Sequence, residues 1–302
     1  MGKGKSLAAS QPKDRKRLRK GFIAACVIPS LVLYALFVLY PTITVFYTSF
    51  FRQTSLGTDR TFVGFQNFIG VFQDAKFTTA LGNQFFLIVV VTIITMTCSM
   101  FFAALLTQSK LRERPFYRTV FFFPNVLAVV VIGTLFVQIY DPTNGLLNAI
   151  VSLFTGTQSH IAWLGGERFT ILWCITIAMV WQAIGYYMVM YMSGMDSISP
   201  ELYEVADLEG MGKFKQFFKI TLPLMWEVVR VTLVFFIIST INMSYTFVQV
   251  MTPETLDVPL TYVYKQAYSS NNYGFAMAAT TVMFAVSFIL AGISNRLTAR
   301  ND

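Results

Sequence analysis

Six long runs of apolar residues constrain the fold of this chain more than any other feature. A bilayer core about 30 Å thick needs roughly 20 apolar residues per helix, and each run is about this long or longer. Polar segments separate the runs, which lie at about Phe22–Ser49, Leu81–Leu106, Thr119–Tyr140, Phe169–Met192, Leu222–Val250 and Phe275–Ile293. The sequence therefore predicts an all-α membrane protein with six transmembrane helices.

The composition agrees with a membrane protein. Only 13% of the residues are charged and 55% are hydrophobic, whereas an average soluble domain has about 25% charged residues. The first run is longer than the apolar region of a cleavable signal peptide, and no A-x-A site follows it, so we expect a retained span. The predicted parts are a basic tail at 1–21, a membrane domain at 22–297 and a second tail at 298–302.

Lysine and arginine placement predicts the orientation, because cytoplasmic loops hold more of these residues. If the runs alternate in direction, 18 of the 23 basic residues fall on one side. The other side holds Arg52, Arg60, Lys76, Arg168 and Lys265. Both termini are therefore predicted to be cytoplasmic. The net charge of +8 lies at membrane flanks, where it sets topology and meets anionic lipid, so we expect no nucleic-acid binding.

Few residues suit catalysis or metal binding. Cys26, Cys98 and Cys174 fall in three different runs without metal-ligand spacing, and His160 is the single histidine. The segment Gly4-Lys5-Ser6 is similar to the end of a phosphate-binding loop, but the earlier glycine and the preceding strand are missing. We therefore expect no catalytic residues, no metal site and no cofactor bound by this chain.

The segment between the fourth and fifth runs, about 193–223, predicts two short helices. In the first helix Ser199 suits the capping position, Pro200 suits the first turn, and Gly210 suits the stop. Leu202 and Val205 fall on one face together with Ala206, whereas acidic residues fall elsewhere. The second helix spaces Phe214, Phe217 and Phe218 at i, i+3 and i+4 among lysines. On this pattern alone, an interfacial helix lying on the bilayer is an equal alternative.

A family resemblance favours a different use of this segment. The stretch Glu204-Val205-Ala206-Asp207-Leu208-Glu209-Gly210, followed by Ile220-Thr221-Leu222-Pro223, resembles the EAA loop of ABC import permeases. It departs from the family pattern at Val205, where an alanine is usual, and at Glu209, where an aspartate is usual. Wider landmarks look like the first permease of maltose and glycerol-phosphate systems. These are the segments 62–68, 141–148, 163–165 and 262–268.

The resemblance implies the type I ABC importer permease fold and a set of partners. These are a second permease, two ATPase subunits that hold ATP and Mg²⁺, an extracellular solute-binding protein and a carbohydrate substrate, at a bacterial cytoplasmic membrane. The loop is expected to couple to an ATPase subunit through Glu201, Glu204, Ala206, Asp207, Gly210, Phe214 and Pro223. We expect Glu204 to anchor the contact and Gly210 to permit close backbone approach. A simple helix stop is the alternative role for Gly210.

Polar residues within two runs are candidates for a pore lining, because such side chains are costly in lipid. Sugars present hydroxyl edges and C–H faces, which suit amides, hydroxyls and aromatic rings. The candidate substrate residues are Trp181, Gln182 and Tyr186 in the fourth run and Ser239, Asn242 and Thr246 in the fifth. Hydrogen bonding between packed helices is an alternative role of about equal weight.

The function expected from these features is the permease subunit of an ABC sugar importer, driven by separate ATPases. An ABC permease for a non-sugar solute is one alternative. An ion-coupled secondary transporter is another, but it predicts intramembrane acids or helices broken at mid-membrane. The sequence suggests neither feature.

Overall fold

The computed structural model describes residues 13–54, 59–108 and 112–298. Within these residues, five helical segments are long and apolar enough to cross a membrane, and a bent helix pair supplies a sixth crossing. The prediction of an all-α membrane fold is confirmed. The straight spans are the three-part segment α1 Lys13–Tyr34, η1 Ala35–Leu39 and α2 Tyr40–Thr48, then α4 Ala75–Gln108, α8 Arg168–Asp196, α12 Trp226–Met251 and α14 Tyr273–Thr298.

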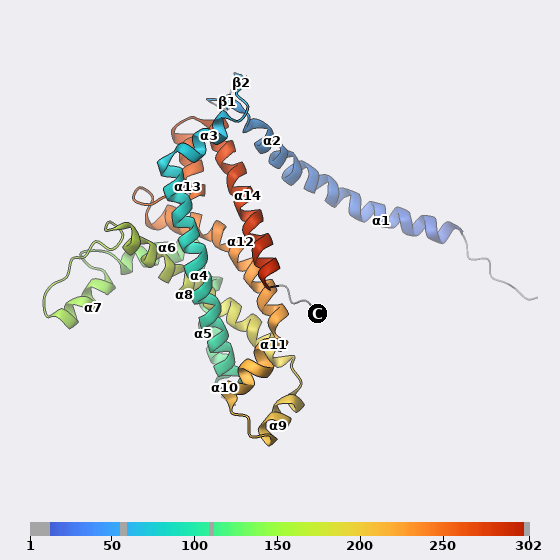
Figure 1. Ribbon diagram of the computed structural model, residues 1–302, viewed down its shortest axis with the longest axis vertical. Helices are drawn as coiled ribbons and strands as arrows, with labels where there is room; N and C mark the ends of the chain where they lie inside the picture. The colour runs from blue at the N-terminus through green and yellow to red at the C-terminus, as the bar shows by residue number, and fades with distance from the viewer. Residues whose placement is uncertain (1–12, 55–58, 109–111, 299–302) are drawn as a thin grey trace, which may run out of the picture.

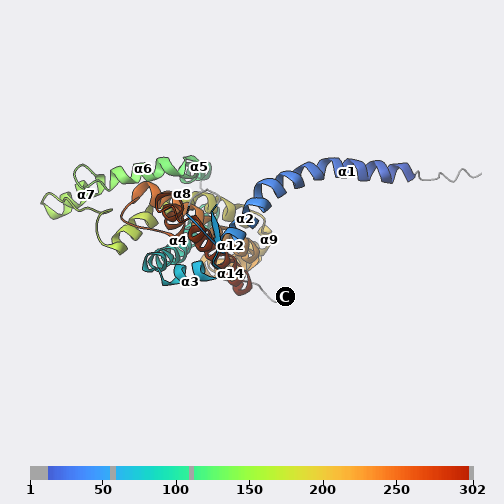
Figure 2. The same ribbon diagram turned by 90° about the horizontal axis from the view of Figure 1, so that it is seen from above.

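The first span projects away from the rest of the chain (Figures 1 and 2). None of its most apolar stretch is buried within the chain. Its helix begins at Lys13, so the end of the tail predicted at 1–21 is helical. Four of the lysines and arginines used to predict orientation lie outside the described residues, as does the segment 4–6. These four are Lys3, Lys5, Lys110 and Arg300.

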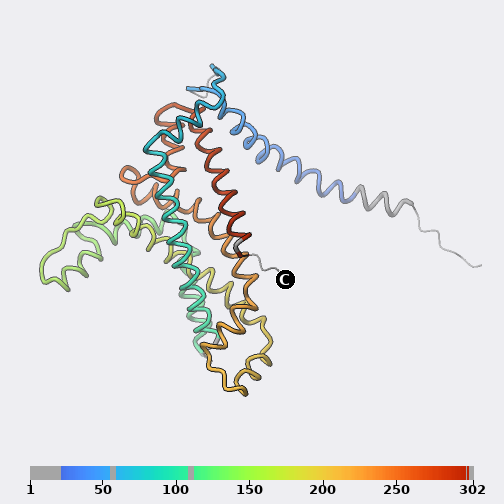
Figure 3. The backbone as a smooth tube through the Cα atoms, in the orientation of Figure 1, coloured from blue at the N-terminus to red at the C-terminus, as the bar shows by residue number. Residues whose placement is uncertain are grey.

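The other spans form a bundle around α8. Figures 1 and 3 show α12 running beside α4 and α14. The α8 helix supplies many of the fully buried side chains, among them Leu172, Met179 and Tyr191. Small residues allow close helix contact: Ser99 Oγ on α4 donates to the Ile184 carbonyl at 2.9 Å. The bundle core therefore rests on the contact of α4 with α8.

The third run is not one straight helix, contrary to the prediction. It forms α5 Arg114–Val126 and α6 Val129–Ile139, which meet at an angle of 95°. Leu127 and Ala128 between them have extended backbone, with ψ of 144° and 136°. Pro124 lacks an N–H donor and clashes with the preceding turn, so it weakens the helix just before the break. The expectation of no broken helix was wrong.

Short elements cap one end of the bundle. The strand β1 Phe51–Gln53 pairs with β2 Arg60–Phe62 in antiparallel register, and α3 Gln66–Gln73 follows. Asn67 on α3 donates through Nδ2 to the carbonyls of Ser49 and Phe51, at 2.8 and 3.0 Å. This one buried amide joins the first span to the strand. At the same end, α13 Pro259–Tyr264 and η3 Lys265–Ser269 precede α14.

A second buried amide organises the loop between α6 and α8. Asn148 lies on α7, Leu146–Thr155, and is only 2% exposed. Its Nδ2 donates to the Ile161 carbonyl at 2.9 Å and, at longer range, to the carbonyls of Asp141 and Pro142. Its Oδ1 accepts hydrogen bonds from Trp163 Nε1 at 3.1 Å and from Ile161 N at 3.3 Å. The segments 141–148 and 163–165, separate in sequence, are thereby one structural unit.

Candidate functional site

The segment 193–223 folds into a compact elbow at the opposite end of the bundle from β1 and β2 (Figure 1). Its first helix is α9, Pro200–Leu208, as predicted, with Ser199 at the capping position. The Ser199 side chain makes no capping hydrogen bond. Gly210 has φ of +74°, a conformation that glycine adopts most readily. No atom within the described residues lies within 4 Å of where its Cβ would be, so this geometry supports the helix-stop role.

The return arm of the elbow is clamped to α9. It consists of α10 Lys213–Gln216, η2 Phe217–Thr221 and α11 Leu222–Leu224. Asp207 on α9 accepts hydrogen bonds from Lys213 Nζ, at 2.9 and 3.0 Å, and from Gln216 Nε2. These bonds lower the pKa of the Asp207 carboxyl below its ordinary value. Gln216 also donates to the Met211 carbonyl at 2.7 Å, so this buried amide closes the elbow.

The outer surface of α9 mixes apolar and acidic side chains. Leu202 and Val205 are exposed, and Leu208 is 89% exposed. Ala206 lies at the spacing that places it on the same face of α9, but it is buried, unlike Leu202 and Val205. Glu201 and Glu204 are also exposed. The arrangement gives a short amphipathic helix whose apolar side has no partner within the described chain.

The remaining predicted coupling residues lie on the return arm. Phe214 is 80% exposed, and Pro223 lies in the first turn of α11. Tyr203 Oη and Thr221 Oγ1 lie 2.8 Å apart and form a hydrogen bond across the elbow. Two sets of side-chain contacts therefore join the two arms of the elbow.

A cavity of about 570 Å³ lies beside the break between α5 and α6. Gln182, Tyr186 and Ser239 line it, so the fold brings together three of the six predicted substrate residues. Asn125 from the end of α5 joins them. Gln182 is 7% exposed, and its Oε1 has no hydrogen-bond partner among the described residues. Gln182 therefore holds a buried, unsatisfied acceptor in the wall of this cavity.

The other three predicted substrate residues are not part of this lining. Trp181 is partly exposed and packs edge to face on Phe136 at 5.7 Å between ring centroids. Asn242 is exposed and Thr246 is half-buried. Asn125 was missed from the sequence, although Pro124-Asn125 in the middle of an apolar run is a recognisable signal for a helix end.

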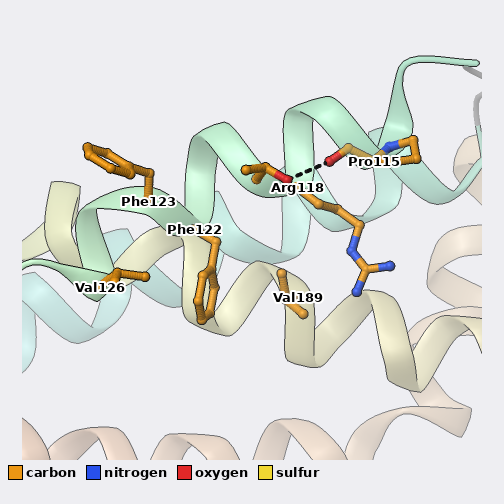
Figure 4. Close-up of a pocket in the computed structure, with 7 residues that line it drawn as sticks. Pro115, Arg118, Phe122, Phe123, Val126 and Val189 are labelled. Atoms are coloured by element: carbon orange, nitrogen blue, oxygen red, sulfur yellow. Dashed lines mark hydrogen bonds between the residues drawn. The ribbon is translucent and has the colours of Figure 1, made fainter.

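A second hollow of about 500 Å³ lies along α5 toward the elbow end. Figure 4 shows Arg118 and Phe122 directed toward α8, whereas Phe123 points away from it. Just beyond this hollow, Arg114 Nη2 contacts both carboxylate oxygens of Asp196, at 2.9 and 2.7 Å. The ion pair fixes the start of α5 against the end of α8. This hollow lies along α5 and α8, whereas the first cavity lies mainly between α8 and α12.

A family model and two relatives of known name place this chain in the same family of transport proteins. Residues 100–301 match the model of the family described as binding-protein-dependent transport system inner membrane component. The probable ABC transporter permease protein YurN of Bacillus subtilis is 34% identical, over 88% of this chain and 91% of its own length. The diacetylchitobiose uptake system permease protein NgcF of Streptomyces coelicolor is 30% identical, over 97% of this chain and 88% of its own.

A solved structure confirms the architecture. It is a chain of a bacterial ABC transporter involved in the import of the acidic polysaccharide alginate, with a TM-score of 0.83 at 21% identity. The match covers 94% of this chain and 97% of that one. The chain thus has the fold of an ABC importer permease. It belongs to the family of binding-protein-dependent transport system inner membrane components, as a multi-pass permease subunit whose ATPase is a separate protein.

Proposed function

We propose that this chain carries a sugar or oligosaccharide across the membrane as one of two permeases in an ABC importer. The cavity beside the α5–α6 break is the observation that carries this proposal. Its lining combines the Asn125 and Gln182 amides, the Ser239 hydroxyl and aromatic rings that include Tyr186. No charged side chain lines it. This set suits neutral polyhydroxylated solutes better than amino acids or phosphate.

Each lining residue has a distinct role in this proposal. Gln182 turns its amide into the cavity and accepts a hydrogen bond from a sugar hydroxyl, which satisfies an Oε1 that is buried without a partner among the described residues. The half-exposed ring of Tyr186 supports a C–H face. Trp181, Asn242 and Thr246 lie outside the cavity lining and are assigned to the wall shared with the second permease.

The elbow 193–223 is proposed to be the part of this chain that the ATPase subunits move when they close. The exposed apolar residues of α9 enter a groove on an ATPase subunit, while Glu201 and Glu204 supply polar contacts at its edge. Phe214 extends this contact, whereas Ala206, Asp207 and Pro223 hold the elbow in shape. ATP and Mg²⁺ bind to two ATPase subunits, and closure of these subunits rocks the permeases between inward-facing and outward-facing states.

The proposed topology places the elbow and both termini in the cytoplasm. The excess of lysine and arginine on that side supports it. The end that carries β1 and β2 then faces outward, where a solute-binding protein delivers the substrate. The relative NgcF is named as a diacetylchitobiose permease, which supports a saccharide cargo for this chain.

Reconstitution with the two ATPases, the second permease and the binding protein tests this function. A panel of saccharides, amino acids and peptides is added to the binding protein, and ATP hydrolysis is measured. We expect stimulation by at least one saccharide and by none of the other solutes. Gln182→Leu should reduce the stimulation about tenfold, since a lost hydrogen bond to a solute costs roughly 1–1.5 kcal/mol.

The matched control is Gln138→Leu, which makes the same change at an exposed position on α6, outside the cavity lining. It should hydrolyse ATP as the unaltered importer does. Stimulation by amino acids or peptides alone would reject the sugar assignment. Equal behaviour of the two variants would reject Gln182 as a substrate contact.

A further inference from the structure

A further hollow lies behind the elbow, and Tyr191 in its lining is hydrogen-bonded to Thr232 in the lining of the substrate cavity. The hollow behind the elbow has a volume of about 610 Å³. One wall is a single face of α4, including Met100, Phe101 and Ala104, and the other is formed by Phe214, Phe217 and Phe218 of the elbow. Figure 1 shows α10 near the lower end of α4, where this hollow lies.

The interior of this hollow is suited to an apolar chain and not to a polar solute. Aromatic, aliphatic and methionine side chains form most of its surface. The hydroxyl of Tyr191, which reaches the hollow, is already hydrogen-bonded within the protein. It lies 2.9 Å from Met96 Sδ and 3.0 Å from Thr232 Oγ1. Phe101 is more than half exposed, so the hollow is continuous with the apolar outer face of α4.

Lysines flank the aromatic stripe of the elbow on both sides. At 100° per residue, Phe217, Phe214 and Phe218 share one face, with Lys213 at one edge and Lys215 and Lys219 at the other. Lys213 lines the hollow and is paired with Asp207. Lys215 and Lys219 are exposed and form no ion pair within the described residues. An apolar groove with one lysine in its lining and two more on the neighbouring face of the same segment matches a phosphate headgroup above an acyl chain.

Charge is divided between the two arms of the elbow. The first arm has four acidic residues, Glu201, Glu204, Asp207 and Glu209, and no basic residue. The return arm from 213 to 221 has three lysines and no acid. An anionic surface is therefore attracted to the return arm and repelled by α9.

From this geometry we infer that the hollow binds one acyl chain of an anionic glycerophospholipid of the cytoplasmic leaflet. Its phosphate lies against Lys215 and Lys219. The inference rests on the proposed orientation of the elbow. Because the lipid fills the space between α4 and the return arm, it stiffens the joint through which an ATPase would move α12. The importer's coupling is then sensitive to the anionic lipid content of the membrane.

The test uses the full-length chain, alone and in complex with its partners, in nanodiscs of equal phosphatidylglycerol and phosphatidylcholine. Native mass spectrometry measures the ratio of the two lipids that stay bound. We expect phosphatidylglycerol to be retained preferentially. Each lysine near an anionic headgroup changes affinity about fivefold, so Lys215→Gln with Lys219→Gln should reduce the preference about 25-fold.

Two further variants sharpen the result. Arg112→Gln with Arg296→Gln removes the same charge at exposed sites away from the hollow and should keep the preference. Ala104→Phe fills the hollow and should release the lipid whatever its headgroup. The inference is overturned if both double variants behave alike, if phosphatidylcholine is retained equally, or if the ATPase displaces the lipid from the complex. These measurements need no transport or ATP hydrolysis, so they can succeed or fail independently of the proposed function.

Discussion

Replacing Asn148 with alanine should open the loop between α6 and α8 without unfolding the bundle. The buried amide is the shared partner of Trp163 Nε1 and of both backbone groups of Ile161. Alanine removes all of these bonds and leaves the indole N–H and the Ile161 N–H without their partner, whereas the Ile161 carbonyl keeps its bond from Trp163 N at 3.1 Å. Each unsatisfied group costs roughly 1–3 kcal/mol when buried. Because this loop is partly accessible to water, we take the low end for both groups and expect about 2 kcal/mol in total.

Hydrogen–deuterium exchange of residues 141–168 in detergent measures this opening. A loss of about 2 kcal/mol raises exchange of the protected amides about 30-fold, whereas amides of α4 and α12 should be unchanged. Asn144→Ala is the matched control, since Asn144 lies in the same turn with an exposed side chain. Its backbone N–H keeps its bond to Asp141 Oδ1, at 2.7 Å. Exchange within threefold of that control would refute the reasoning.

Two other predictions concern glycines. Gly185→Ala should lower the melting temperature in detergent by about 5 °C or more, because its Cβ would lie 1.8 Å from the Phe121 carbonyl oxygen. Gly292→Ala, in open space on α14, should leave the melting temperature unchanged. Gly210→Asp should abolish ATPase stimulation while insertion continues, since φ of +74° disfavours a side chain. Gly212→Asp, with φ of −63°, should keep stimulation, and equal loss in both would contradict this reasoning.

The sequence predicted the spans and the elbow well because both depend on local signals. Membrane spans are set by the length of apolar runs. An apolar run of 20 or more residues is read as a membrane-spanning helix and not as a core helix of a soluble protein. The elbow is set by Pro200, Gly210 and the spacing of the phenylalanines, each of which acts within one or two turns. These features need no knowledge of distant contacts. The family resemblance then added the permease assignment, which the comparisons confirm.

Contacts between distant residues were not predictable in the same way. Gln216 looks like an ordinary polar residue of a basic helix, yet it is buried and closes the elbow through Asp207. Ala206 was placed on the apolar face with Leu202 and Val205, yet it alone of the three is buried. Asn148 carries no pattern that marks it as a shared hydrogen-bond partner. In each case the side chain's role depends on which segment packs over it.

The break in the third run and the substrate cavity have one physical cause. A helix that ends inside a membrane leaves backbone carbonyls without partners, and lipid cannot satisfy them. Such a break is stable only where protein or water meets the freed groups, so α5 must end against a polar space. The cavity lined by Asn125 supplies that space directly beside Leu127 and Ala128. The proline that weakens α5 therefore accounts for a helix end beside the amides of Asn125 and Gln182 in this cavity.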